Sequence, residues 1–98
     1  MNWRSKKILN AAKFAPGCFG CGADNCGQVV MAHSNQSRDG KGMSLKAHDY
    51  RVAALCNECH MEIDQGRHLS REERIARWEV AHRATIGWLI ESGRLVVA

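Results

Sequence analysis

The sequence lacks long hydrophobic runs, internal repeats and an N-terminal stretch with the pattern of a secretory signal. Its apolar run over residues 86–90 is interrupted by Gly87 and is far shorter than the roughly 20 residues that cross a bilayer. The five cysteines are an odd number, and without a signal peptide a secreted disulfide scaffold is disfavoured. We therefore expect a soluble protein of a reducing cytoplasm, with no membrane partner.

A chain of 98 residues is expected to form one domain, residues 1–98, with a modest core. Such a domain buries only about 60–70% of its unfolded surface, so an additional staple is expected. The net charge of +4 and the pI near 9.0 favour a polyanionic partner, although many basic proteins bind no nucleic acid.

The strongest motif is a pair of C-x-x-C sequences. This spacing lets two thiolates bind one tetrahedral Zn²⁺ from a tight turn, and a structural zinc site normally has four ligands. The first pair lies in the glycine-rich residues 17–27, which predict the turns of a zinc knuckle. The four predicted ligands of one structural Zn²⁺ are Cys18, Cys21, Cys56 and Cys59. The fifth cysteine, Cys26, is interpreted as a packed or free thiol.

Local signals predict the elements around this zinc site. Residues 3–14 are expected to form a short helix that an Ala-Pro-Gly sequence ends. Residues 28–33 and 51–55 predict two short strands, and the polar residues 34–43 between them predict a loop. A helix is expected to follow the second C-x-x-C pair and to be closed by residues 66–69.

A second helix is predicted from Ser70 to Gly93. Ser70 and Glu73 have the spacing of a capping box, and Gly93 is a natural C-terminal cap. One face carries residues that recur at spacings of three and four, namely Ile75, Trp78, His82, Ile86 and Leu89. We interpret His82 as a packed histidine on this face, and we expect residues 94–98 to add an edge strand.

His60 and Asp64 follow the second C-x-x-C pair at a spacing of four residues. If a helix starts there, the two side chains lie on one face, about 6 Å apart at Cβ. That separation lets them share a second ion, bound through nitrogen and oxygen and therefore hard or borderline in character.

The order of a strand ending in His33, a loop, a second strand and C-x-x-C-H at a helix start resembles the ββα-metal, or HNH, nucleases. The segments A-H-S-N, G-K-G, K-A-H-D and A-A-L-C-N-E-C-H-x-x-I-D-Q-G resemble more narrowly a group of small phage and prophage nucleases, some of them associated with recombination. The resemblance implies an α+β fold in which a small zinc-stapled ββα-metal finger, residues 17–66, is flanked by an N-terminal helix, residues 3–14, and a long C-terminal helix, residues 70–93.

The resemblance also implies roles for particular residues. His33 would be the general base, His60 and Asp64 would hold the catalytic Mg²⁺ or another divalent metal, and Asp49 stands where the motif has its middle asparagine. Two departures matter. Ala32 precedes His33 where some members have a further metal-binding histidine, so the ion would have fewer protein ligands. The charged Asp49 is expected either to orient His33 or to become a ligand itself.

The expected activity is metal-dependent endonucleolytic hydrolysis of nucleic acid, DNA in the first instance, in the bacterial host of a phage or prophage. A recombination protein is a candidate partner. Arg38, Lys41 and Lys46 are candidate phosphate contacts, although a flexible charged loop also explains them. The alternative is a non-catalytic zinc module that binds nucleic acid or protein. A zinc deaminase is disfavoured because the sequence has no H-x-E with a downstream P-C-x-x-C.

Overall fold

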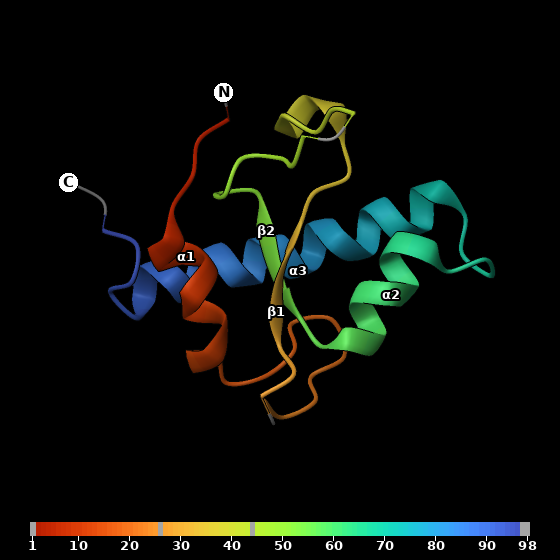
Figure 1. Ribbon diagram of the computed structural model, residues 1–98. Coiled ribbons are helices and arrows are strands. Elements are labelled where there is room, and N and C mark those ends of the chain that lie inside the picture. Colours follow the sequence, from red (N-terminus) through yellow and green to blue (C-terminus); the bar gives the residue numbers. More distant parts are fainter. Residues whose placement is uncertain (1, 26, 44, 97–98) are drawn as a thin grey trace.

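The computed structural model describes residues 2–25, 27–43 and 45–96. They form a small α+β structure with a two-stranded sheet and three α-helices (Figure 1). In chain order the elements are α1 (Lys6–Asn10), the 3₁₀ helix η1 (Ala11–Phe14), β1 (Val30–His33), the 3₁₀ helix η2 (Ser37–Asp39), β2 (Val52–Leu55), α2 (Asn57–Gln65) and α3 (Arg71–Glu91). Within the described ranges, no helix is both long enough and apolar enough to cross a membrane.

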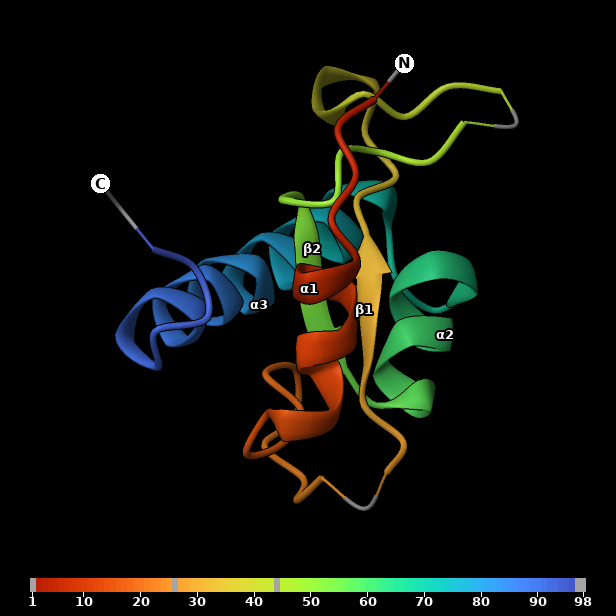
Figure 2. The same ribbon diagram turned by 60° about the vertical axis from the view of Figure 1, so that its left-hand side comes forward.

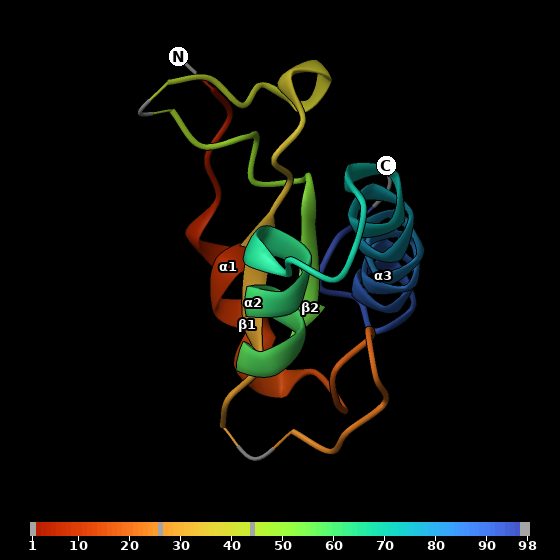
Figure 3. The ribbon, with the colours of Figure 1, turned by 90° about the vertical axis from the view of Figure 1, so that its right-hand side faces the viewer.

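The sheet is an antiparallel pair in which Val30 lies opposite Leu55 and His33 lies opposite Val52. All four residues of β2 are buried, because α3 packs along this strand. Figure 3 shows α1 and α3 on opposite sides of the two strands, with α2 beside them. The hairpin is therefore enclosed by helices, and its end at His33 opens toward the long connection between the strands.

The buried side of α3 also satisfies polar groups of β2. Thr85 is fully buried, and its Oγ1 accepts a hydrogen bond from the Ala54 amide at 2.9 Å. His82 lies with Nδ1 2.7 Å from the Val52 carbonyl oxygen and stacks on the ring of Trp78. The prediction of a packed histidine is thus confirmed. Both contacts give the outer edge of β2 the partners that a third strand would otherwise supply.

The start of α3 has the geometry that its sequence predicts. Ser70 Oγ accepts from the Glu73 amide at 3.1 Å, and the Glu73 carboxylate accepts from the Ser70 amide at 2.9 Å. The capping box is therefore confirmed. At the other end α3 stops at Glu91, and Gly93 adopts the left-handed conformation at φ 77° that closes a helix.

The N-terminal helix is shorter than predicted. It begins at Lys6 rather than at residue 3, and from Ala11 onward it tightens into η1. Ser5 is the N-cap, and its hydroxyl accepts from the Ile8 amide at 3.3 Å. The residues before it are extended because they bind another part of the chain, as Figure 2 shows for residues 2–5 beside the segment that leads into β2.

Three other boundaries differ in detail. β1 begins at Val30 and β2 at Val52, so each strand is shorter than its predicted range. The predicted loop over residues 34–43 contains η2, where Asp39 is buried and accepts a hydrogen bond from the Ser34 hydroxyl at 2.6 Å. Residues 94–96 form no strand, and the last two residues of the predicted edge strand lie outside the described residues, as does Cys26.

Candidate functional site

The four cysteines of the two C-x-x-C pairs form one cluster. Their sulfur atoms all lie within 4.8 Å of one another, and the Sγ atoms of Cys21 and Cys56 are 3.9 Å apart. Four thiolates around a tetrahedral zinc, each about 2.3 Å from the ion, would lie about 3.8 Å apart. The donor set and its spacing therefore fit a metal such as zinc, and the cluster joins the residues before β1 to the start of α2 (Figure 1).

Backbone amides favour the thiolate form of Cys18 in this cluster. The amides of Gly20 and Cys21 point at Cys18 Sγ from 3.2 and 3.4 Å. Burial alone raises the pKa of Cys18, but hydrogen bonds from the backbone of Cys56, Cys21 and Gly20 outweigh it and lower the pKa to about 6. A β-carbon at Gly20 would lie 3.2 Å from Cys59 Sγ, so this turn needs its glycine.

Cys59 shows what four thiolates in this cluster would require. Burial raises the pKa of the Cys59 thiol well above its ordinary 9.0, and the sulfurs of Cys21, Cys18 and Cys56 raise it further. Four thiolates cannot crowd together without a positive charge between them, and a bound metal supplies that charge. The cluster is therefore a candidate centre for a metal such as zinc.

Arg77 of α3 extends the electrostatic support of the cluster. Its Nη2 lies 3.9 Å from Cys59 Sγ, and its Nη1 donates to the Glu62 carboxylate at 2.7 Å. A zinc ion with four thiolates carries a net charge of −2, so the guanidinium offsets part of that charge. Sequence inspection missed Arg77, because nothing local relates a residue of α3 to a cysteine of α2.

His33 and Asp49 form the second group of interest. His33 Nε2 lies 2.8 Å from Asp49 Oδ1, and the aspartate is 2% exposed. Arg4 Nη1 donates to the same oxygen at 2.9 Å, and the Ser5 amide donates to the other oxygen at 2.6 Å. Burial raises the pKa of Asp49, but hydrogen bonds from His33, Ser5 and Arg4 outweigh it and hold the pKa below its ordinary 3.8. The carboxylate is therefore a fixed, ionised partner of His33.

The structure also brings His60 and Asp64 together on one face of α2. His60 Nε2 lies 3.0 Å from Asp64 Oδ2, at the predicted spacing of four residues. The other oxygen, Asp64 Oδ1, accepts from the Asn35 side chain at 2.7 Å. Both side chains of the pair are about one-third exposed, so an ion can reach them.

The two pairs lie on different sides of β1. Ala32 points into the core cluster that contains Cys59, Ile63 and Trp78, on the side of α2. The next residue, His33, points the other way and lines a hollow of about 370 Å³ beside α1, together with Met31, Lys13 and Lys46. Within the described parts of the chain, no hydrogen bond or ion pair connects His33 or Asp49 to the pair on α2, and the four cysteines are the one group of three or more potential ligands.

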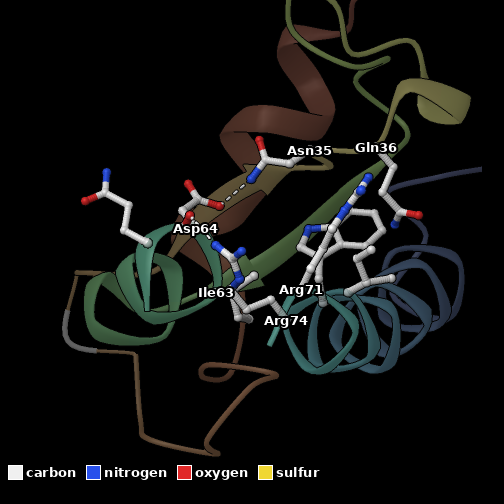
Figure 4. Close-up of a pocket in the computed structure, with 9 residues that line it drawn as sticks. Asn35, Gln36, Ile63, Asp64, Arg71 and Arg74 are labelled. Atoms are coloured by element: carbon white, nitrogen blue, oxygen red, sulfur yellow. Dashed lines mark hydrogen bonds between the residues drawn. The ribbon is translucent and has the colours of Figure 1, made fainter. Parts of the chain in front are cut away.

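A second cavity, also of about 370 Å³, adjoins Asp64 between α2 and α3. Figure 4 shows Arg74 reaching toward Asp64, with Asn35 bonded to the same aspartate from the other side. Arg74 Nη1 donates to the Asp64 carbonyl oxygen at 3.1 Å, and its buried Nε has no partner among the described residues. Arg71 lines the same cavity, whose floor includes Ile63 and Trp78. Because the two arginines line it, this cavity can accept an anionic group beside the Asp64 carboxylate.

The predicted phosphate contacts have different surroundings. Arg38 pairs with Glu79 of α3, and Lys41 Nζ lies 3.3 Å from the Gly42 carbonyl oxygen. Lys46 is exposed and lines the hollow next to His33. Arg4 was missed as a partner of Asp49, because a helix starting at residue 3 would have directed it to solvent rather than to a residue 45 positions away.

These features define a small α+β protein with a four-cysteine cluster that can bind a metal such as zinc. No family model matches the chain, and no match was found among the curated proteins or the solved structures.

Proposed function

We propose that this protein is a metal-dependent endonuclease of the HNH type, which hydrolyses phosphodiester bonds of nucleic acid, most readily DNA. The observation that carries the proposal is the contact between His33 and the buried carboxylate of Asp49. A neutral imidazole whose Nε2–H donates to Asp49 leaves Nδ1 as an acceptor, as a general base requires. Removing the proton of an attacking water in this way is commonly worth about 10²–10⁴ in rate.

The hollow next to His33 supports this role. Lys13 and Lys46 line it together with the imidazole, so a phosphate that enters meets two positive charges beside a base. Charge of this kind holds the nucleic-acid backbone without reading its sequence. Weak sequence preference, or targeting by a partner such as a recombination protein, follows from the proposal.

His60 and Asp64 are the proposed ligands of the catalytic ion. Two neighbouring ligands of an octahedral Mg²⁺, each about 2.1 Å from the ion, lie about 3.0 Å apart, the separation seen between His60 Nε2 and Asp64 Oδ2. When bound, such an ion stabilises negative charge on phosphoryl oxygens and on the leaving alkoxide. Arg71 and Arg74 line the cavity next to Asp64, where they offer charge to a phosphate bound at that ion.

The four-cysteine centre has a structural role in this proposal. Four thiolates leave a zinc ion no open position for water or substrate. The centre instead fixes the start of α2, and with it His60, relative to the residues before β1. Structure and activity therefore depend on two different metals.

The test is the nicking of plasmid DNA and the cleavage of single-stranded, duplex and branched oligonucleotides with Mg²⁺ or Mn²⁺. His33→Ala should abolish cleavage and keep the zinc content and the fold, because only the base is removed. His60→Ala should abolish cleavage and weaken binding of the second metal. His68→Ala is the matched control, because His68 is 67% exposed at its side chain and belongs to neither pair. Equal rates for wild type, His33→Ala and His60→Ala would contradict the proposal.

A non-catalytic zinc module that binds nucleic acid or protein is the second candidate. One observation favours it. His60 and Asp64 bind each other, as do His33 and Asp49, and the two pairs lie on different sides of β1. In that case the pure protein would bind nucleic acid but cut no substrate with any divalent ion. The nicking assay and a binding assay on the same preparation separate the two functions.

A further inference from the structure

An exposed group of aromatic rings lies next to the His33–Asp49 pair. Trp3 is 50% exposed and Tyr50 is 40% exposed, although the chain has few aromatic residues. Their ring centroids are 5.7 Å apart, and His48 stacks on Tyr50 at 4.9 Å with an angle of 6° between the planes. Three rings from two distant segments thus form one surface, which we call the aromatic platform.

The platform is held in place by backbone hydrogen bonds. The Trp3 amide donates to His48 Nδ1 at 3.0 Å, and the Trp3 carbonyl oxygen accepts from the Asp49 amide at 3.0 Å. Asn2 secures the same segment with hydrogen bonds from its side chain to two carbonyl oxygens of residues 40 and 46. Because Trp3 is tied on both sides, its indole is presented to solvent without the freedom of a loose terminus. The backbone of Trp3, rather than its ring, is therefore bonded directly to the backbone of Asp49.

The surroundings of the platform are cationic. The Arg51 guanidinium lies 5.7 Å from the centre of the Tyr50 ring, and the exposed Lys46 lies on the same segment as His48. Arg4 follows Trp3, and its side chain is 40% exposed. The acidic partner of Arg4, Asp49, is buried, so it presents little negative charge to solvent. A flat apolar ring surrounded by positive charge matches a nucleotide whose base and phosphate are both accessible.

We propose that the aromatic platform is a stacking site for an unpaired base, with Trp3 as the contacting ring and Tyr50 and His48 as its support. Every base has a π-face, so stacking of this kind is tolerant of sequence, and it is available only to bases that are not already stacked in a duplex. The proposal names single-stranded nucleic acid, or an unpaired stretch in a larger substrate, as the ligand class. It rests on the proposed function insofar as it supplies the substrate of the site at His33.

The experiment measures binding rather than cleavage, so that it does not depend on the catalytic proposal. Fluorescent single-stranded DNA, single-stranded RNA and duplex DNA of equal length are titrated with zinc-loaded protein without added divalent metal. Trp3→Ala should weaken binding of the single strands about tenfold and leave duplex binding nearly unchanged. Trp3→Phe should retain most of the affinity. The slope of affinity against salt should stay the same, because no phosphate contact is removed.

Phe14 provides the matched control. It is 58% exposed, and the side chains of Lys13 and Arg94 lie 5.3 and 4.9 Å from its ring centre, so it is a second exposed ring near positive charge. Among the described residues no other aromatic ring pairs with Phe14, and Phe14→Ala should leave both affinities unchanged. An equal effect of Phe14→Ala and Trp3→Ala, or an equal loss on duplex and single strand, would overturn the proposal.

A second measurement uses the wild type alone and covers the case in which Trp3→Ala fails to fold. Trp78 is buried, so quenching of tryptophan fluorescence by acrylamide reports chiefly on the more exposed indoles, Trp3 among them. A saturating single-stranded oligonucleotide should protect this fluorescence, and a duplex of the same length should protect it much less. Equal quenching with and without the single strand would overturn the proposal that the platform stacks an unpaired base. Absence of cleavage together with protection by the single strand would instead reject only the catalytic proposal.

Discussion

Asp49 accepts a hydrogen bond from the Ser5 amide at 2.6 Å, and this contact helps to tie the N-terminal segment to the chain just before β2. The same carboxylate lies 2.8 Å from His33 Nε2 at the end of β1. One buried charge thus connects three parts of the chain that are distant in sequence. Its removal should affect stability as well as any chemistry at His33.

Asp49→Asn should lower the free energy of unfolding at neutral pH by about 2–3 kcal/mol, because hydrogen bonds to a charged group are exchanged for weaker ones. The pKa of Asp49 is held below its ordinary 3.8, so its contribution is complete above that pH and is lost as pH falls through the folded-state pKa. The difference between wild type and variant should therefore be constant from about pH 6 to 8 and shrink below about pH 4. Urea unfolding across this pH range measures the difference in unfolding free energy.

Asp24→Asn is the matched control for that experiment, because it makes the same chemical change at an exposed aspartate. Its unfolding free energy should follow that of the wild type at each pH. If the difference in unfolding free energy between wild type and Asp49→Asn grew as the pH fell, the assignment of Asp49 as a stabilising, ionised carboxylate would be contradicted.

Replacement of a cysteine in the metal centre should unfold the protein. Cys18→Ser and Cys56→Ser each remove one thiolate from a centre whose metal contributes on the order of 10 kcal/mol, which is comparable with the whole stability of a small domain. Zinc content by mass spectrometry and far-ultraviolet circular dichroism should fall together, and strong chelation of the wild type should have the same effect. Cys26→Ser should keep both signals. Loss of zinc in Cys26→Ser with zinc retained in Cys18→Ser would refute this ligand set.

Arg77→Met should weaken zinc retention without removing a ligand. Methionine keeps much of the apolar stem but not the guanidinium that lies 3.9 Å from Cys59 Sγ. Loss of such an outer partner typically costs about tenfold in metal affinity. Competition with a chromogenic zinc chelator measures the change. Arg83→Met, at an exposed position of the same helix, should release zinc as the wild type does.

Two glycines should respond to alanine in opposite directions. At Gly20 a new β-carbon would lie 3.0 Å from a methyl group of Leu55 and 3.2 Å from Cys59 Sγ, so Gly20→Ala should destabilise the protein by about 1–3 kcal/mol and reduce its zinc affinity. At Gly87, inside α3, nothing lies within 4 Å of the new atom. Gly87→Ala should stabilise the helix by about 0.5–1 kcal/mol. Thermal unfolding of both zinc-loaded variants measures the two changes in stability. Destabilisation by both substitutions would contradict the prediction of opposite signs.

Much of the local structure follows from short-range patterns. The C-x-x-C pairs, the Ser70–Glu73 capping box and the spacing of His60 and Asp64 all involve residues within five positions of one another. Their geometry is set by one turn of backbone, so the residue types at those positions suffice to predict it. The same holds for Gly93, whose left-handed conformation ends α3.

The site around His33 could not be derived in this way. Sequence alone predicted a helix from residue 3, because Trp3 falls on the same helical side as Ile8, Leu9 and Ala12. In the folded chain, Arg4 and the Ser5 amide bind Asp49, 45 and 44 positions away, and these contacts hold the segment extended. Interactions across such a separation leave no periodic trace in the sequence.

The sequence by itself thus determined which four cysteines form the cluster, the order of the strands and helices, and the pairing of His60 with Asp64. The tertiary structure decided that Arg77 approaches Cys59, that Trp3 lies against Tyr50, and that His33 and Asp64 lie on different sides of β1. The physical reason is that a helix turn or a knuckle is specified by neighbours along the chain. The faces that packed elements present to one another depend instead on which apolar side chains are buried together once the whole chain has folded.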